Sequence, residues 1–346
     1  MFNKLLGRFS KDMGIDLGTA NTLVYIRDKG IVINEPSVVA INKRNDQIIA
    51  VGEDAKKMVG KTPSHIQIVK PLVGGVISDF EVTERMIKYF INKIHQESFS
   101  LVPRPRVVIS IPLDVTEVER KAVEDATKSA GAREVYLIEQ PLAAAIGSRL
   151  PIQESAGFMV VEIGGGTTEI AVISLGGIVT FNSLPTAGNE LDENIVQYAR
   201  ENFNLLLGER TAETIKIKIG TVASDFEKQE TTMRGRDLIS GLPKEVIITN
   251  QHIKEAIYRS VRKIVEAIRD AIEKTPPELV ADIYQRGLVL SGGGALLKGL
   301  DRMIFQEIKI PVHIADDPLT SVVRGTGIIL EDLDNLKEVL LPSTSD

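Results

Sequence analysis

The stretch that decides the fold is VVEIGGGTTEIAV, residues 160–172. A short apolar run leads to one carboxylate, Glu162, which is followed by three glycines, two threonines and a second apolar run. This order predicts a strand, a tight glycine turn and a second strand. Because glycine has no Cβ, the N–H groups of such a turn can converge on an anion, and the threonine hydroxyls add further donors.

A second copy of this pattern lies near the N-terminus. IDLGT at 15–19 and VEIGG at 161–165 share an apolar residue, an acid, an apolar residue and a glycine, and each opens a predicted three-strand meander. We interpret the two as an internal duplication, the alternative being a chance similarity of two hairpin turns. A carboxylate beside such a loop would repel phosphate unless a cation lay between them. Two such hairpins that face each other therefore predict a Mg²⁺-nucleotide held in a cleft.

Helices and buried strands alternate along the rest of the chain, which predicts an α/β fold. Apolar residues at helical spacing predict helices at 82–94 and 251–274. Thr116 and Glu119 have the spacing of a capping box, directly after a predicted strand at 106–112. SGGGALLKGL at 291–300 predicts a third glycine turn, whose bare backbone could pack against a base or a sugar.

Composition excludes several classes of protein. The 346 residues carry a net charge of −6, with a pI near 5.5, which argues against a general nucleic-acid binder. The sequence has no cysteine, so disulfides and cysteine metal sites are excluded and a reducing cytosol is expected. No apolar run approaches the roughly 20 residues that a membrane span needs.

Other nucleotide motifs do not fit this sequence. MVGKTP at 58–63 contains the Gly-Lys-Thr of a P-loop, but Ala55 stands where that motif requires its first glycine. Neither triple-glycine loop is a dinucleotide fingerprint, because Glu169 and Leu297 occupy the positions of the third glycine. The four histidines are scattered, which is more typical of solvated or structural residues than of metal ligands.

Six segments together closely resemble the MreB family of bacterial actins: IDLGTANT, IEQPLAAAIG, GGGTTEIAV, GERTAE, EKTPPEL and SGGGALLKGLD. The resemblance runs in order from about residue 12 to 332. It implies the actin-like ATPase fold shared with sugar kinases and chaperone ATPases, in which two duplicated α/β domains, each with a smaller inserted subdomain, surround a cleft for ATP or ADP and Mg²⁺. The boundaries it implies are domain I at 1–147, with IA at about 1–32, 77–147 and 318–346 and IB at about 33–76, and domain II at 148–317, with IIA at about 148–184 and 254–317 and IIB at about 185–253.

The same resemblance implies a role for each matching residue. Asp16 and Glu162 would hold Mg²⁺, partly through water, and Glu139 would orient the attacking water with help from Thr167. The implied phosphate contacts are Gly18, Thr19, Ala20, Asn21, Gly164, Gly165, Gly166 and Thr167, the implied adenosine contacts are Glu213, Thr214, Ile215 and Lys216, and Gly293, Gly294, Ala295 and Leu296 would flank the base. Without the resemblance, we would interpret Glu139 as a helix N-terminal acid stabilised by the helix dipole, and Glu213 as an ordinary exposed charge.

One residue departs from the family pattern, which usually has Asp where this chain has Glu162. The extra methylene lengthens the reach of the carboxylate by roughly 1.5 Å. Mg²⁺ demands near-ideal octahedral geometry, and positioning errors of about 1 Å can cost on the order of 100-fold in rate. Glu162 therefore predicts a Mg²⁺ site with one fewer water, or slow hydrolysis, whereas binding through the glycine loops should survive.

Two segments predict contact with a membrane surface. In MFNKLLGRFSK, residues 1–11, apolar residues gather on one side of a helix and basic residues mainly on the rest, which suits an interfacial helix on an anionic leaflet. The alternatives are a frayed terminus and a segment docked on the body of the protein. SFSLVPRPR at 98–106 sets apolar residues beside arginines, and the resemblance implies that a hydrophobic loop here also meets the membrane. The predicted membrane-contacting residues are Met1, Phe2, Leu5, Leu6, Phe9, Phe99 and Leu101. Many weak anchors on one filament would bind by avidity.

The function implied by the resemblance is a polymerisation-coupled ATPase at the cytoplasmic face of the inner membrane. Its paired protofilaments would organise peptidoglycan synthesis and maintain rod shape, with the cell-wall elongation machinery as partners and no nucleic acid. Two alternatives stay open: a slow or binding-only paralogue that copolymerises, for which Glu162 leaves room, and a small-molecule kinase of the same fold, for which only Glu139 could serve as the base. We expect no chaperone-type substrate domain, because the nucleotide core occupies almost the whole sequence.

Overall fold

The computed structural model describes residues 10–95, 104–223 and 226–342. The chain divides into two compact units. Unit 1 comprises Met1–Ala156, Ile173–Val179 and Leu319–Asp346, and unit 2 comprises Gly157–Val172 and Thr180–Pro318. The finer division into four subdomains stays a prediction.

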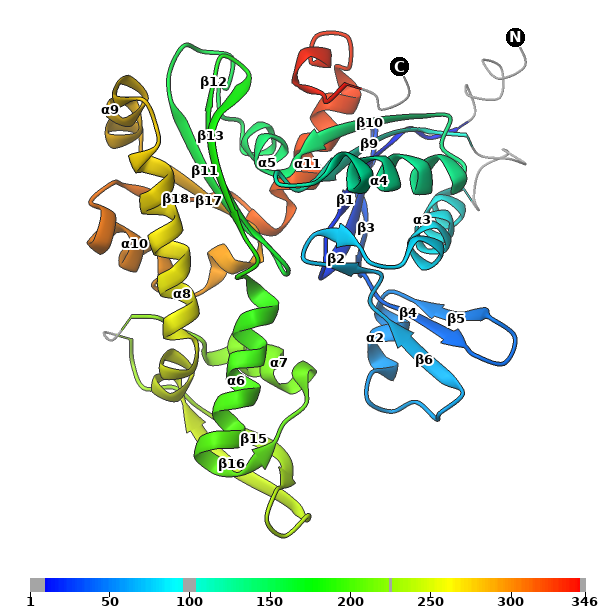
Figure 1. Cartoon of the computed structure of the whole chain (residues 1–346), viewed down its shortest axis with the longest axis vertical. Helices are drawn as coiled ribbons and strands as arrows, with labels where there is room; N and C mark the ends of the chain where they lie inside the picture. Colours follow the sequence, from blue (N-terminus) through cyan, green and yellow to red (C-terminus); the bar gives the residue numbers. More distant parts are fainter. Residues whose placement is uncertain (1–9, 96–103, 224–225, 343–346) are drawn as a thin grey trace. The chain divides into compact units, whose positions relative to one another are not determined.

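Unit 1 is built on a five-stranded sheet in the order β10-β9-β1-β2-β3 (Figure 1). Its strands are β1 (Met13–Leu17), β2 (Asn21–Ile26), β3 (Gly30–Pro36), β9 (Arg106–Ile111) and β10 (Glu134–Glu139). The first three strands form an antiparallel meander, and β9 and β10 run parallel to β1. The predicted meander that opens at 15–19 is therefore confirmed; it forms one side of a mixed sheet in which β1 is the central strand.

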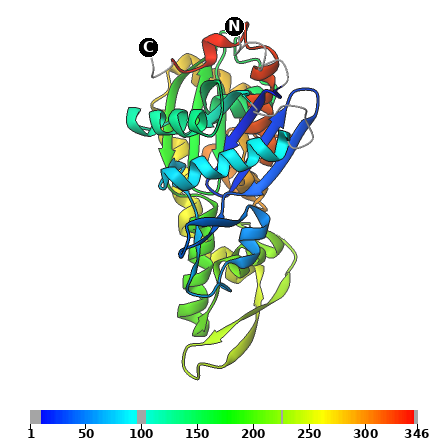
Figure 2. The same cartoon turned by 90° about the vertical axis from the view of Figure 1, so that its right-hand side faces the viewer.

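Helices pack on both faces of this sheet. On one face, α3 (Phe80–His95) and α4 (Glu117–Ser129) lie side by side (Figure 2), and the apolar residues of α3 share one core with alternate residues of β1. The α4 helix begins at the predicted capping box of Thr116 and Glu119. On the other face, α5 (Gln140–Gly147) and α11 (Ser321–Glu331) pack against each other and the sheet.

Two glycines let α5 and α11 touch backbone to backbone. A Cβ added to Gly325 would lie 1.9 Å from the carbonyl oxygen of Ala143, and one added to Gly147 would lie 1.8 Å from that of Ser321. Both distances are far below van der Waals contact, so the crossing requires glycine at each position.

The rest of unit 1 consists of small elements. A three-stranded sheet in the order β5-β4-β6 has its own small core with α2, and β7 pairs with β8. The bounds are β4 (Val39–Asn42), β5 (Gln47–Val51), α2 (Glu53–Met58), β6 (Ile66–Val69), β7 (Leu72–Val73) and β8 (Val76–Ile77).

The main sheet of unit 2 has the order β13-β12-β11-β17-β18. Its strands are β11 (Phe158–Ile163), β12 (Thr168–Ser174), β13 (Gly177–Leu184), β17 (Leu288–Ser291) and β18 (Val312–Ile314). As in unit 1, three consecutive strands lie next to two later strands that run parallel to the first of them. Both sheets thus have the same strand order, which confirms the predicted duplication.

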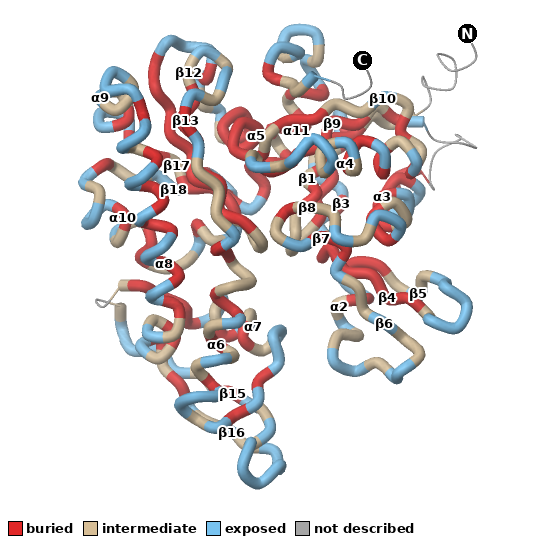
Figure 3. Tube along the Cα trace, in the orientation of Figure 1, coloured by how far each residue is buried: buried red, intermediate tan, exposed pale blue. Residues whose placement is uncertain are grey.

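The helices of unit 2 bury one long core. Isoleucines on one face of α8 (Asn250–Glu273) join residues of β11, β17, α6 (Gly188–Phe203) and α7 (Glu209–Ile219) in it. The remaining elements are β14 (Leu205–Leu206), β15 (Glu230–Asp237), β16 (Pro243–Thr249), α9 (Pro277–Arg286) and α10 (Leu300–Ile308). Figure 3 shows buried backbone along the central strands and an exposed turn between β15 and β16.

Within the described part of the chain, no helix is both long enough and apolar enough to cross a membrane. The predicted membrane-contacting residues fall in segments 1–9 and 96–103, which lie outside the described residues. These residues are Met1, Phe2, Leu5, Leu6, Phe9, Phe99 and Leu101.

Candidate functional site

The first glycine loop connects β1 to β2. The backbone N–H of Gly18 donates to the carbonyl of Asn21 at 3.2 Å, which closes a tight turn. Ser37, which directly follows β3, supports the loop, since its Oγ donates to the carbonyl of Gly18 at 2.5 Å and its N–H donates to that of Ala20 at 3.0 Å. Thr19 Oγ1 accepts from the N–H of Gly75 at 2.8 Å, which ties the loop to the β7–β8 turn.

Asp16 lies next to this loop and pairs with a serine of the neighbouring strand. In the parallel ladder Asp16 lies opposite Ser110, whose Oγ donates to Asp16 Oδ1 at 3.0 Å. Burial raises the pKa of Asp16 to about 6, although the hydrogen bond from Ser110 acts in the opposite direction. A bound cation would favour the charged form, so this environment fits a metal-binding carboxylate.

Replacing Asp16 with Asn should stabilise the nucleotide-free protein at neutral pH. Because burial raises the pKa of Asp16 from 3.8 to about 6 in the folded state, this group lowers stability as the pH rises above 3.8, and the cost is complete above about 6. We expect Asp16→Asn to raise the free energy of unfolding by about 2 kcal/mol at pH 7.5. The gain should shrink as the pH falls through about 6, and vanish below the ordinary Asp pKa of 3.8. Urea unfolding at several pH values measures this, and equal stability at pH 7.5 would contradict it.

Glu139 lies where β10 ends and α5 begins. It is the residue before the first helical position, with φ −69° and ψ 138°, yet its side chain makes no capping hydrogen bond within the described part of the chain. Burial raises the pKa of Glu139, and the charge of Arg120 partly counteracts this. A half-buried acid with a raised pKa that does not cap its helix is typical of functional sites.

The second glycine loop repeats the turn of the first. The N–H of Gly164 donates to the carbonyl of Thr167 at 2.9 Å, as Gly18 does to Asn21. The first turn of α6 holds this loop, because Gly188 and Asn189 donate their N–H groups to the carbonyls of Gly164 and Gly165 at 3.1 and 2.8 Å. In a planar trans peptide the N–H points opposite to the C=O. The N–H groups of Gly165 and Gly166 therefore point away from α6, as donors to an anion would.

Glu162, the acid that is longer than in the family pattern, is only 7% exposed and packs over two glycines. A Cβ added to Gly292 would lie 2.5 Å from Glu162 Oε1, and one added to Gly164 would lie 3.5 Å from both carboxylate oxygens. The φ of Gly292 is +78°, a value that also favours glycine. The third glycine loop thus makes room for this carboxylate beside the second loop.

The adenosine-contacting residues predicted on α7 lie close to the same loops. Lys216 Nζ donates to the carbonyl of Gly188 at 2.6 Å and pairs with Asp192 at 2.9 Å, so it connects α7 to the helix that holds the second loop. Ile215 is buried in the core, so only its backbone could contact a ligand. Thr214 Oγ1 donates to a carbonyl of its own helix at 2.8 Å, and Glu213 is half-buried.

The third loop packs against the end of β11 and near the end of α7. A Cβ added to Gly294 would lie 2.2 Å from Ile163 Cγ2, and one added to Gly220, just after α7, would lie 3.3 Å from Leu297 Cδ1. The predicted base-flanking residues Gly293 to Leu296 form a 3₁₀ turn, in which Ala295 is buried and Leu296 is 54% exposed. Unit 2 therefore brings together the second loop, the third loop and α7.

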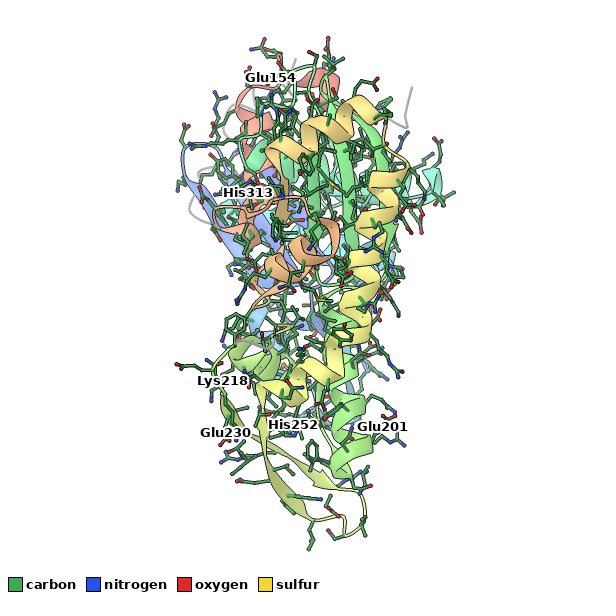
Figure 4. All side chains as sticks on the ribbon, turned by 90° about the vertical axis from the view of Figure 1, so that its left-hand side faces the viewer. Glu154, Glu201, Lys218, Glu230, His252 and His313 are labelled. Atoms are coloured by element: carbon green, nitrogen blue, oxygen red, sulfur yellow. The ribbon has the colours of Figure 1, made fainter. Side chains whose placement is uncertain are left out.

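Metal binding in the described residues would depend on few protein ligands. No group of three or more His, Cys, Asp or Glu there is arranged to hold a metal ion. This is expected for Mg²⁺ on a nucleotide, which is usually held by one or two carboxylates together with phosphates. His252, labelled in Figure 4 far from His313, has a structural role, because its Nδ1 accepts from the N–H of Thr249 at 3.0 Å at the start of α8.

A family model described as MreB/Mbl protein matches residues 10–338. The cell shape-determining protein MreB of Escherichia coli K12 is 50% identical over 338 residues, covering 96% of this chain and 97% of that protein. The cell shape-determining protein Mbl of Bacillus subtilis 168 is 49% identical over 328 residues, covering 95% of this chain and 98% of that protein.

Solved structures of related proteins also match this chain. Crystal structures of MreB5 of Spiroplasma citri bound to ADP and to AMPPNP both match with a TM-score of 0.90 and 37% identity, covering 95% of this chain and 98% of that chain. The MamK double helical filament matches with a TM-score of 0.78, covering 92% of this chain and 98% of that chain, and at 22% identity it supports the fold alone. The actin-like fold is thus confirmed, and the chain belongs to the MreB/Mbl family.

Proposed function

We propose that this protein is an ATP-dependent bacterial actin that assembles into paired protofilaments at the inner face of the cell membrane, organises cell-wall synthesis and determines cell shape. The observation that carries the proposal is the repeated half-site: an acid followed by a glycine hairpin at the same position of both main sheets. The names of the relatives support the role in cell shape, and the ADP and AMPPNP complexes of MreB5 support nucleotide binding.

ATP is the substrate in this proposal. The backbone N–H groups and threonines of the first and second glycine loops bind its phosphates, while α7 and the third loop bind its adenosine. Asp16 and Glu162 would hold Mg²⁺, partly through water, and such an ion would supply charge neutralisation at the phosphates. The pKa of Asp16 and the packing of Glu162 over glycine both fit these roles.

Glu139 orients the water that attacks the γ-phosphate, with Thr167 assisting. A bond forms between the water oxygen and the γ-phosphorus, and the bond from this phosphorus to the bridging oxygen breaks, which yields ADP and phosphate. Glu139 accepts a hydrogen bond from the attacking water, takes its proton as the bond to phosphorus forms and later releases it to solvent. The raised pKa of Glu139 brings it closer to the operating pH of a general base.

Membrane attachment is supported by where the two candidate segments join the described part of unit 1. The N–H of Arg104 donates to Ser10 Oγ at 2.9 Å, and the N–H of Lys11 donates to His95 Nε2 at 3.0 Å. Burial lowers the pKa of His95, which keeps its ring neutral and able to accept this bond at pH 7. Segments 1–9 and 96–103 therefore join the described structure at one place.

This place also carries excess positive charge. The backbone N–H and the side-chain Nε of Arg106 each donate to the carboxylate of Asp12 at 2.8 Å. The guanidinium of Arg133 lies 3.7 Å from the same carboxylate. Together with Lys11 and Arg104, the basic groups here outnumber the acidic ones, which suits an anionic lipid surface.

Placing a negative charge in each of the two apolar segments should abolish binding to anionic vesicles. We expect Leu6→Glu and Leu101→Glu each to weaken cosedimentation with phosphatidylglycerol vesicles by about 10-fold, and the double variant to remove it, because the two anchors act together. Ser345→Glu, which adds the same charge elsewhere in the chain, is the control. Unchanged binding of the double variant would contradict the proposal.

Phosphate release from Mg·ATP, measured over a range of protein concentrations, tests the proposed ATPase directly. We expect the rate per molecule to rise above a threshold concentration, because assembly completes or stabilises the catalytic arrangement. A flat, nonzero rate would indicate a monomeric ATPase and contradict a polymerisation-coupled one. The second candidate function is that of a slow or binding-only family member, which the longer acid Glu162 favours. The Glu162→Asp variant, measured alongside, tests it: near-zero phosphate release by the wild-type protein that Glu162→Asp restores would identify such a member.

A further inference from the structure

Each acid of the repeated half-site lies opposite a serine. In unit 1, Asp16 pairs with Ser110 in the parallel ladder of β1 and β9. In unit 2, Glu162 pairs with Ser291 in the parallel ladder of β11 and β17. Because β1 corresponds to β11 and β9 to β17 in the two strand orders, the duplication repeats the acid together with its serine.

The two serines differ in whether the hydroxyl has a hydrogen-bond partner. Ser110 Oγ donates to Asp16 at 3.0 Å. Ser291 is fully buried, and its Oγ finds no hydrogen-bond partner among the described residues. A buried hydroxyl without a partner is costly, so it requires an explanation.

Glu162 lies directly opposite Ser291 in this ladder. Residues directly opposite in a parallel ladder project from the same face of the sheet, as the bond between Ser110 and Asp16 illustrates. Glu162 Oε1 also lies over Gly292, the residue that follows Ser291, within 2.5 Å of where a Cβ would be. The hydroxyl of Ser291 and the carboxylate of Glu162 therefore project from the same face of the sheet at neighbouring positions.

We propose that Ser291 is a positioning residue for Glu162: with Mg²⁺ and nucleotide bound, its hydroxyl donates to one carboxylate oxygen and leaves the other for the metal or its water. Glutamate has one more rotatable bond than aspartate, so a fixed donor restricts the position of its carboxylate more than it would restrict that of Asp. Groups of this kind, which orient a metal-binding carboxylate, typically contribute about 10- to 100-fold to metal affinity. The inference rests on the proposed nucleotide function.

Fluorescence titration with N-methylanthraniloyl-ADP, in Mg²⁺ and in EDTA, tests this without relying on turnover. We expect Ser291→Ala to weaken binding about 10-fold in Mg²⁺ and to leave it within about twofold in EDTA. Ser291→Thr, which keeps the hydroxyl, should restore most of the loss. Ser260→Ala, at another buried serine of unit 2, is the control for general destabilisation.

A double-mutant cycle shows whether Ser291 acts through Glu162. In a Glu162→Gln background, which already lacks the charged acid, Ser291→Ala should have little further effect. Equal weakening with and without Mg²⁺, or no weakening at all, would overturn the inference while nucleotide binding by the wild-type protein still supported the proposed function. Wild-type protein that does not bind the analogue would instead refute the proposed function itself.

Discussion

Changing Glu139 to Gln should lower the rate of phosphate release from Mg·ATP by about 100- to 10,000-fold and leave nucleotide affinity within about twofold. Glutamine keeps the shape of the side chain but carries no charge and accepts a proton poorly. Glu139 is half-buried, its pKa is raised by burial, and it does not cap α5 within the described structure. Removing its charge should therefore affect the chemical step far more than the fold.

The matched control is Glu134→Gln, at the exposed beginning of the same strand. This variant should hydrolyse ATP at the wild-type rate. If Glu162 makes the wild-type rate too low to compare, both variants are measured in the Glu162→Asp background. Full activity of Glu139→Gln would mean that Glu139 is only a helix-terminal acid, which is the interpretation that its sequence position alone favours.

Changing Gly325 to Ala should lower the free energy of unfolding by about 3 kcal/mol. The added methyl would lie 1.9 Å from the carbonyl oxygen of Ala143 and 2.6 Å from its carbon. Both atoms belong to the backbone of α5, so no side chain can move aside and the two helices must separate. Since α11 also packs on β1 and β9, the separation would disturb the centre of unit 1.

The expected sign of the change in unfolding free energy is opposite to the one that helix propensity alone predicts. Gly325 lies inside a helix, where alanine is ordinarily favoured over glycine by about 1 kcal/mol. A stabilised Gly325→Ala variant in urea unfolding would therefore show that the close crossing of α5 and α11 is absent. The control is Gly208→Ala, because a Cβ there meets nothing within 4 Å, and we expect a change of less than about 1 kcal/mol.

Several features of this protein could be predicted from short segments of sequence. The two acid-glycine hairpins have the same closing hydrogen bond, from Gly18 to Asn21 and from Gly164 to Thr167, as their shared pattern indicated. The helix of residues 82–94 was predicted from its apolar period, and α3 extends it by two residues at its beginning and one at its end. These predictions succeed because a turn, a cap and a helical face depend on residues that are close in the chain.

The candidate site itself depended on longer-range structure. The hydroxyl of Ser110 reaches Asp16 across 94 positions of the sequence, and Ser291 lies opposite Glu162 across a still longer separation, from position 162 to position 291. No local pattern shows that either serine lies opposite an acid, because parallel strands are joined through crossover connections and their register is set by the packed sheet. A search for serines at matching positions of the two repeats is the sequence signal that could have found them.

Sequence alone determined the duplicated glycine hairpins, the acids beside them and the family resemblance, because each of these depends on short runs of adjacent residues. Only the tertiary structure decided which groups surround those acids: that Glu162 packs over Gly292, and that α11 joins unit 1 by crossing α5 at two glycines. Packing of this kind depends on the order of strands and on the close approach of distant segments. These long-range contacts are cooperative properties of the folded chain, which is why no single stretch of the sequence specifies them.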